Sequence, residues 1–240
     1  MADNAIAAGL TAASLTGIEV LKGLGKEERE AIAAKCRSRR YKAGELVLAQ
    51  DDSSQDVFFI ISGKVRVGLI DRSGKDTLFR EMSAGAMFGE LSAIDGSKRS
   101  ATIRAEEASW LALMSPQDFL DIATTYPNIS MATLRWVTGL VRELSSRLHS
   151  FNVLPVKQRV RVEVLRMASE SGVENNEARI EPPPRHADIA ARVGTHREGV
   201  TRELNDLQKA GLIKRLSGNE GRALLVTDVS KLRDLLEDIA

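Results

Sequence analysis

The chain has few of the side chains that build metal, redox or disulfide sites. Its 240 residues include one cysteine, Cys36, and three histidines, His149, His186 and His196. One thiol cannot form an internal disulfide or a four-cysteine zinc or iron–sulfur site. The three histidines show no spacing typical of metal ligands. We therefore expect no bound metal and no metal-dependent enzyme.

The chain also has almost no net charge and no long apolar run. The formal net charge is +1, so bulk charge gives no argument for a nucleic acid partner. No apolar run reaches the length of a membrane span, about eighteen residues. Residues 1–16 are rich in alanine but include Asp3 and no basic cluster. We therefore expect a flexible leader rather than a secretory signal, and a cytoplasmic protein.

Cys36 lies in the segment 33–37, which has the character of a helix. A packed or half-buried thiol is the expected role. A redox sensor is the alternative, because Lys35 and Arg37 can lower the pKa of the thiol.

The first half of the chain has the pattern of a small β-roll. After a helix expected over 17–36, short runs rich in β-branched and aromatic residues alternate with turn residues such as Ser62-Gly63. The expected strands lie at 45–49, 57–61, 64–70, 76–80, 101–104 and 109–113. Many short strands at this spacing are typical of a barrel or a jelly-roll-like roll.

The following residues have the pattern of one long helix that ends in a hinge at 152–155. Apolar side chains recur at alternating steps of three and four, which is the seam of a two-stranded coiled coil. The seam residues are Leu134, Val137, Val141, Leu144, Leu148 and Phe151. The pattern predicts pairing with the same helix of a second copy. The alternative is one amphipathic helix that lies on its own domain.

The stretch 88–103 carries side chains suited to a ligand with a phosphate and a sugar. Gly89 lets the backbone approach a ligand, and the next residues can open a short helix whose N–H groups attract an anion. Arg99 offers a planar fork to phosphate oxygens, Ser100 adds a hydroxyl, and Glu90 can accept from sugar hydroxyls. The alternative is a surface ion pair between Arg99 and Glu90, with glycines that only make turns.

This stretch resembles the phosphate-binding cassette of cyclic-nucleotide-binding domains, in the pattern Phe-Gly-Glu-Leu, spacer, Arg-Ser-Ala-Thr. From about residue 18 to the C-terminus, the chain is similar to the CRP/FNR superfamily of transcription regulators, in its cyclic-nucleotide-responsive branch. The ligand residues that the resemblance implies are Gly89 and Glu90 at the ribose, Arg99 and Ser100 at the cyclic phosphate, and Leu91 next to them.

The chain departs from the family's pattern on the long helix. Cyclic AMP receptors present consecutive threonine and serine hydroxyls to the adenine, and the matching positions here are Leu144 and Ser145. Ser145 can still reach across a dimer, but the missing hydroxyl removes a hydrogen bond worth roughly 0.5–1.5 kcal/mol. We therefore expect cyclic AMP as the effector, with cyclic GMP as a competitor or a second ligand.

Other functions fit the pattern less well. Oxygen sensors of the superfamily need several cysteines, and carbon monoxide sensors need haem ligands from the roll. A superfamily member with no small-molecule effector is the remaining alternative, although a complete cassette argues against it. An enzyme built on a phosphate-binding barrel, such as an isomerase or a metal-dependent oxygenase, needs acids, bases or metal ligands, and the roll contains no histidine.

Two short helical patterns flank Gly194 near the C-terminus, which is typical of a helix-turn-helix. Runs at 212–216 and 222–227 predict a β-hairpin wing behind it. The apolar residues expected to face inward are Ile189, Ala190 and Val193 on the first helix and Val200, Leu204 and Leu207 on the second.

The outer face of the second helix carries Arg197, Glu198 and Arg202 near its start, where recognition helices meet base edges. Arginine suits guanine, and glutamate suits the amino group of cytosine. The alternative is a solvated charged face with an arginine–glutamate pair.

The block 196–202 resembles the recognition helix of cyclic AMP receptors. The resemblance implies palindromic half-sites of base sequence GTGA, with flanking bases that can differ because His196 is not the usual neighbour. The expected DNA contacts are Arg185, Thr195, His196, Arg197, Glu198 and Arg202.

The sequence thus predicts an α+β protein that is not an enzyme: a homodimeric transcription regulator that binds a cyclic nucleotide, double-stranded DNA and RNA polymerase. The predicted parts are a leader at 1–16, a β-roll at 17–126, a dimerisation helix and hinge at 127–154, and a winged helix-turn-helix at 155–240.

Overall fold

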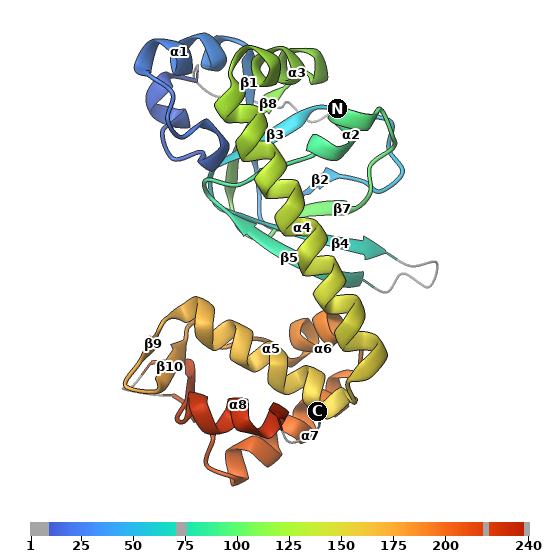
Figure 1. Ribbon diagram of the computed structural model, residues 1–240, viewed down its shortest axis with the longest axis vertical. Coiled ribbons are helices and arrows are strands. Elements are labelled where there is room, and N and C mark those ends of the chain that lie inside the picture. Colours follow the sequence, from blue (N-terminus) through green and yellow to red (C-terminus); the bar gives the residue numbers. More distant parts are fainter. Residues whose placement is uncertain (1–9, 71–75, 218–220, 238–240) are drawn as a thin grey trace. The chain divides into compact units, whose positions relative to one another are not determined.

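The computed structural model describes residues 10–70, 76–217 and 221–237, and describes only the backbone at 69–70, 76–79, 150–153 and 237. The chain divides into two compact units, Met1–Val141 and Arg142–Ala240. The predicted fold class is confirmed, because the model has a β-sheet domain, a long helix and a helix-turn-helix in that order (Figure 1). The two units divide inside the long helix rather than at either of its ends.

Two four-stranded antiparallel sheets form the roll of the first unit, in the orders β1-β8-β3-β6 and β2-β7-β4-β5. Their core includes Phe59, Ile60 and Leu111, which are fully buried. The strands are β1 Cys36–Tyr41, β2 Leu46–Leu48, β3 Val57–Ser62, β4 Lys64–Ile70, β5 Asp76–Ser83, β6 Met87–Phe88, β7 Thr102–Ala105 and β8 Ser109–Met114.

The N-terminal segment differs from its prediction in two ways. Ala12 and Leu15 are buried in a 3-10 helix, η1 (Ala12–Leu15), so this part of the expected leader packs on the first unit rather than being loose. Residues 1–9 of the expected leader lie outside the described part. The helix expected over 17–36 is limited to a 3-10 turn, η2 (Glu19–Leu21), and to α1 (Lys26–Ala34).

Cys36 was predicted on a helix, and that prediction is wrong. It is the first residue of β1 and pairs with Met114 of β8, so tertiary strand pairing overrides the local helical pattern. Burial, and secondarily the negative charge of Asp118, raises the pKa of the Cys36 thiol to about 12. The two basic residues expected to lower the pKa form ion pairs elsewhere, Lys35 with Asp118 and Arg37 with Asp56, each at 2.8 Å. The sensor hypothesis thereby loses its physical basis.

Two helices that follow the roll lead into the second unit. Ser115 caps α3 (Pro116–Thr125), since its hydroxyl accepts from the Asp118 N–H at 3.1 Å and Pro116 begins the helix. The long helix α4 (Pro127–Val153) spans the predicted dimerisation segment. Its first part packs on the roll, where Ile129 is fully buried.

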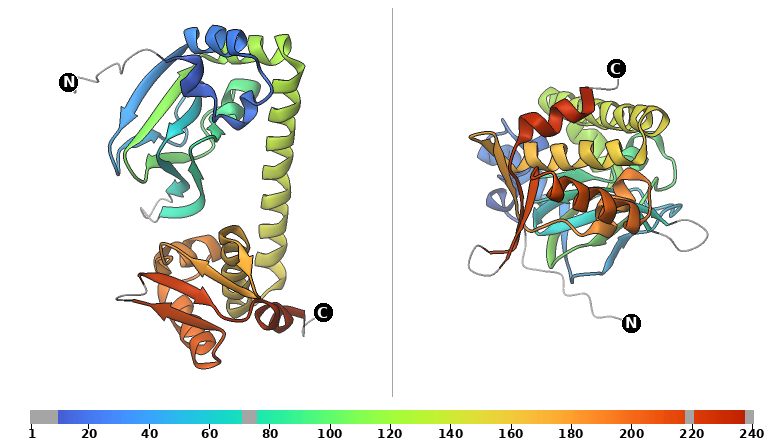
Figure 2. Two further views of the ribbon diagram at one scale, coloured as in Figure 1. Left: turned by 90° about the vertical axis from the view of Figure 1, so that its left-hand side faces the viewer. Right: turned by 90° about the horizontal axis from the view of Figure 1, so that it is seen from below.

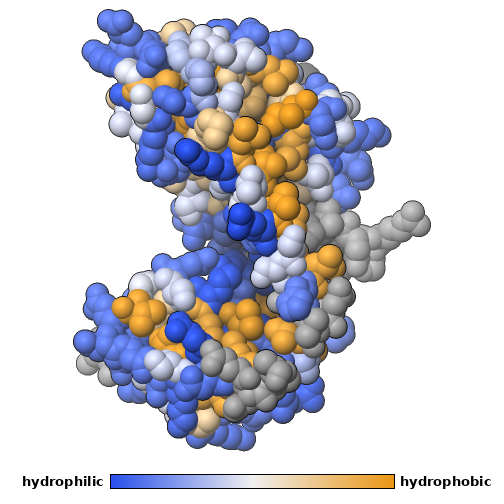
Figure 3. Space-filling model, in the orientation of Figure 1, coloured by the Kyte–Doolittle hydropathy of each residue, from blue (hydrophilic) through white to orange (hydrophobic). Residues whose placement is uncertain are grey.

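The predicted seam is mostly exposed along α4. Val137 is half-buried, whereas Leu134, Val141, Leu144 and Leu148 are 56–62% exposed. Figure 3 shows apolar side chains gathered along this helix. The Phe151 side chain lies outside the described part.

The second unit packs helices against a four-stranded sheet of order β11-β12-β10-β9, which Figure 2 shows beside α5 and α7. All six inward-facing residues predicted for the helix-turn-helix are buried in its core. The elements are α5 Val156–Ser171, β9 Val173–Glu174, β10 Glu177–Ile180, α6 His186–Val193, α7 Arg197–Lys209, β11 Ile213–Leu216, β12 Ala223–Val226 and α8 Val229–Glu237.

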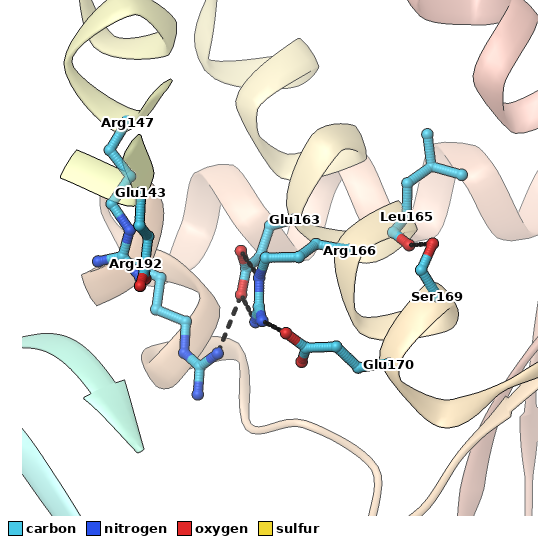
Figure 4. A network of polar contacts seen from close by, with 8 residues as sticks. All are labelled: Glu143, Arg147, Glu163, Leu165, Arg166, Ser169, Glu170 and Arg192. Carbon is cyan, nitrogen blue, oxygen red and sulfur yellow. Dashed lines mark hydrogen bonds and ion pairs between the residues drawn. The ribbon is translucent and has the colours of Figure 1, made fainter. Parts of the chain in front are cut away.

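A charged network joins α5 to α6 in this unit (Figure 4). The Glu163 carboxylate is 8% exposed and accepts from Arg166 at 2.7 and 2.9 Å and from Arg192 at 3.3 Å. Arg166 also pairs with Glu170, which is exposed. Glu163 is thus the shared acceptor that ties the helix after the hinge to the first helix of the helix-turn-helix.

Candidate functional site

Arg99 of the cassette is buried in the first unit, with 3% of its surface exposed. Its Nη1 donates to the Gly89 carbonyl at 2.9 Å, its Nη2 to the Asp56 carbonyl at 2.7 Å, and its Nε to the Ser54 hydroxyl at 3.1 Å. Burial lowers the pKa of Arg99, while Asp56, Asp52 and Glu90 act in the opposite direction. The surface ion pair with Glu90, which was the alternative to a phosphate site, is not among the bonds of Arg99 in the described part.

Gly89 and Arg99 meet because the glycine has no side chain. Gly89 has φ +84°, and an added Cβ there would lie 2.8 Å from the Asp56 carbonyl and 2.9 Å from Arg99 Nη1. The left-handed backbone and this close approach both require glycine. Gly89 also caps α2 (Glu90–Asp95), the short helix that the sequence predicted.

Glu90 is also buried, at 3% exposed. Its Oε1 accepts from the indole Nε1 of Trp136 on α4 at 3.1 Å. Burial raises the pKa of Glu90; its backbone N–H, Trp136, Arg80 and Arg99 partly offset that effect. Sequence reasoning did not find Trp136, because nothing in its local pattern separates it from an ordinary apolar helix residue.

The other predicted ligand residues are accessible. Leu91 and Ser100 are exposed beside the buried pair of Glu90 and Arg99. Leu144 and Ser145 are exposed on the part of α4 that belongs to the second unit. The structure therefore gathers Gly89, Glu90 and Arg99 into one closed site and leaves the remaining ligand residues open to solvent.

The candidate DNA-binding face lies on α7. Gly194, with φ +62°, ends α6 and makes the turn into α7, whose N-cap is His196. His196, Arg197, Glu198 and Arg202 are all exposed. In the described part, no ion pair engages Arg197, Glu198 or Arg202, so the arginine–glutamate pair of the alternative interpretation is absent there.

Two predicted DNA contacts are partly engaged within the protein. Arg185 occupies the N-cap position of α6, and its Nε bonds to Asp188 at 2.8 Å, although its side chain is 62% exposed. Thr195 is half-buried in the turn, and its N–H donates to the Ala190 carbonyl at 3.0 Å.

Comparison with known proteins covers both halves of the chain. Residues 38–126 match the model of the cyclic nucleotide-binding domain, and residues 158–235 match the model of the Crp-like helix-turn-helix domain. The chain belongs to the CRP/FNR superfamily of transcription regulators. This superfamily consists of DNA-binding regulators and not of enzymes, as the sequence predicted.

Relatives of this CRP/FNR regulator match over most of their length. The cyclic AMP receptor protein of Thermus thermophilus is 26% identical over 202 residues, 83% of this chain and 90% of the relative. A CRP-like cAMP-activated global transcriptional regulator of Mycobacterium tuberculosis is 28% identical over 209 residues, 85% of this chain and 92% of the relative. A CooA mutant from Carboxydothermus hydrogenoformans has a TM-score of 0.79 at 24% identity, covering 95% of this chain and 100% of its own, which shows the shared fold.

The structure of this CRP/FNR regulator also shows polar contacts within the DNA-binding unit that the sequence did not predict. Nδ1 of His186 lies 2.7 Å from the Thr201 hydroxyl on α7, and its Nε2 lies 3.3 Å from Nη2 of Arg215 on β11. Arg215 also donates to Asn205 at 3.4 Å. These contacts join the wing to α6 and α7 around a groove of about 690 Å³, whose lining includes Arg197 and Arg222.

Among the described residues of this regulator, no helix is both long and apolar enough to cross a membrane. No group of three or more histidine, cysteine, aspartate or glutamate side chains gathers to hold a metal within the same residues.

Proposed function

We propose that this regulator is a cytoplasmic homodimer that binds palindromic DNA in response to cyclic AMP and acts with RNA polymerase. One observation carries the proposal: Gly89, Glu90 and Arg99 converge in the cassette of a matched cyclic nucleotide-binding domain. The relatives named for cyclic AMP support this choice of effector.

Different cassette residues bind different parts of the ligand. Arg99 and Ser100 hold the cyclic phosphate, because a guanidinium fork and a hydroxyl both donate to phosphate oxygens. Glu90 accepts from the ribose hydroxyl beside Gly89, and Leu91 borders the pocket. Cyclic GMP is the competing ligand, since Leu144 lacks the hydroxyl that specifies adenine in cyclic AMP receptors and only Ser145 retains one.

The exposed side of α4 supports the homodimer. Four apolar seam residues of one helix stand 56–62% exposed, which is unusual for an isolated chain in water. Pairing with the same seam of a second copy removes these side chains from water. The interface residues proposed here are Leu134, Val137, Val141, Leu144, Leu148 and Phe151.

The exposed start of α7 supports base recognition. Arg197 and Arg202 suit guanine and Glu198 suits cytosine, with Thr195, His196 and Arg185 toward the backbone and flanking bases. Two-fold symmetry requires half-sites about one helical turn, roughly 34 Å, apart. Cyclic nucleotide favours the arrangement of α4 and the 152–155 hinge that gives this spacing, which is a population shift.

Calorimetric titration with cyclic AMP and then cyclic GMP tests the effector, on protein that is folded and free of bound nucleotide. We expect cyclic AMP to bind and to increase binding of a palindromic GTGA operator in a gel-shift assay. Comparable binding of both nucleotides means that Leu144 has relaxed the base selection. Binding of neither contradicts the effector part and leaves the DNA-binding part to be judged alone.

A second candidate is a regulator of the same family with a different effector or with none. It is favoured by the closed cassette, because three Arg99 donors already bond within the protein and Glu90 is buried. Operator binding at full strength without nucleotide would support this candidate over the first.

A further inference from the structure

One hydrogen bond joins the buried carboxylate of the cassette to the long helix. Glu90 is 3% exposed, and the side chain bonded to it is Trp136 of α4, at 3.1 Å between Nε1 and Oε1. Both residues belong to the first compact unit. A ligand hydroxyl cannot reach a carboxylate that is this deeply covered unless a covering group moves.

Trp136 is held on its ring face as well as at its N–H. The Arg80 guanidinium lies over the indole at 4.6 Å from the ring centroid, within the range of a cation–π contact. Arg80 is also close enough for its positive charge to favour ionised Glu90. The indole also packs against buried apolar side chains of the first unit.

There is room beside Trp136 for the indole to move. A groove of about 610 Å³ is lined by Trp136 and Arg80 with Arg135 of α4 and the apolar side chains of Met82 and Met87. A displaced indole can therefore leave Glu90 for this groove, which is open to solvent on one side.

We infer that Trp136 couples ligand entry to α4: a ribose hydroxyl that binds Glu90 displaces the indole N–H, and the displaced indole shifts the helix that carries it. Leu134, two residues before Trp136, belongs to the exposed seam, so a shift of α4 at this level alters the dimer surface. This inference rests on the proposed function, because it requires a ligand with hydroxyls at the cassette.

A purely structural role for Trp136 is the alternative, and the chain offers a matched control. Trp110 of β8 also carries a guanidinium over its ring, that of Arg40 at 4.9 Å. Its indole Nε1 is buried without a hydrogen-bond partner in the described part, so it makes no bond to Glu90 there. Trp110 and Trp136 are the two tryptophans of the chain, so each can be observed alone.

The first measurement uses the Trp110→Phe protein, in which Trp136 is the only tryptophan. On titration with cyclic AMP or cyclic GMP, we expect its emission to move to longer wavelength and acrylamide quenching to increase. In the Trp136→Phe protein, the emission of Trp110 should stay unchanged on the same titration. This measurement leaves Trp136 in place, so it does not depend on the folding of a Trp136 variant.

The second measurement compares nucleotide affinity by calorimetry. Trp136→Phe should bind the nucleotide about threefold to tenfold more tightly than wild type, because no hydrogen bond to Glu90 has to be broken. It should also bind operator DNA more strongly than wild type when nucleotide is absent, whereas Trp110→Phe should match wild type in both assays.

The outcomes separate the inference from the proposed function. If a nucleotide binds, but Trp136 emission does not change and Trp136→Phe has wild-type affinity, the inference is wrong and the proposed function stands. If neither nucleotide binds the wild-type protein in the calorimeter, the proposed function fails first, and the inference fails with it.

Discussion

The arginines of the cassette and those of the DNA-binding face on α7 differ in burial and in bonding. Arg99 is 3% exposed and donates to the Gly89 and Asp56 carbonyls, whereas Arg197 and Arg202 are exposed and have no ion pair in the described part. A buried charge must be satisfied inside the protein, but an exposed one is satisfied by water and counterions.

Because of this difference in burial, ligand binding requires a structural change at one site and not at the other. Because Arg99 is 3% exposed and three of its five N–H groups already bond within the protein, a phosphate can reach it only if covering groups move, so binding there is tied to a change in structure. DNA at α7 displaces only solvent and ions, so that face needs no rearrangement of its own. Substitutions should therefore affect stability at the first site and leave it unchanged at the second.

The largest effect is expected at Arg99. Arg99→Ala removes the phosphate fork and the bonds that Arg99 donates to the part-buried carbonyls of Gly89 and Asp56, so nucleotide affinity should fall by at least about 100-fold and stability by about 1–3 kcal/mol. Calorimetry and urea denaturation measure the two effects. Arg99→Lys is the control for charge alone. Ligand-stimulated DNA binding that survives in Arg99→Ala would contradict the assignment of the phosphate site.

The next effect is expected on α7. Arg197→Ala and Arg202→Ala should each weaken operator binding by about 10- to 100-fold, because each removes a base contact worth about 1–3 kcal/mol. The free energy of unfolding and the nucleotide affinity should not change. Lys209→Ala, an exposed change at the other end of α7, is the matched control for gel-shift titrations. An equal loss in the Lys209 variant would show that the effect is only one of net charge.

Two glutamates of the second unit, buried Glu163 and exposed Glu170, allow a direct comparison of a buried with an exposed charge. Glu163→Ala should reduce the free energy of unfolding by about 1–3 kcal/mol, because it leaves Arg166 and Arg192 without their shared acceptor (Figure 4). Glu170→Ala, which removes only the exposed partner of Arg166, should cost less than about 0.5 kcal/mol. Urea denaturation of both variants measures the difference, and equal losses would show that burial of Glu163 is not decisive.

The smallest effect is a pH dependence at His186. Burial, then the charges of Arg215 and Arg197, lowers the pKa of His186 in the folded protein. The unfolded chain therefore binds the proton more readily, so the stability from neutral His186 is present above a pH of about 6.5 and is lost as the pH falls below it. Wild type should lose more stability than His186→Gln between pH 7.5 and 5.0. Parallel stability curves for the two proteins would rule out this role.

Local sequence patterns determined the parts of this protein whose residues lie close together along the chain. The heptad steps of α4 and the apolar faces of α6 and α7 are local periods, and they indicated the fold class. The family came from the resemblance of the motifs at 88–103 and 196–202 to known regulators. Val137 shows the limit of such a pattern, because it is half-buried although the heptad treats it as equivalent to its exposed neighbours.

Only the tertiary structure decided which distant groups meet. Trp136 reaches Glu90 across 46 residues, and Arg99 reaches the Asp56 carbonyl across 43. Asp118 lies near Cys36 because β1 pairs with β8 just before α3 begins. Strand pairing and helix packing set these distances, and they depend on the whole core rather than on any local period. The sequence by itself thus determined which chemical groups the protein has at its sites, and the fold determined which of them are buried, bonded or free to bind.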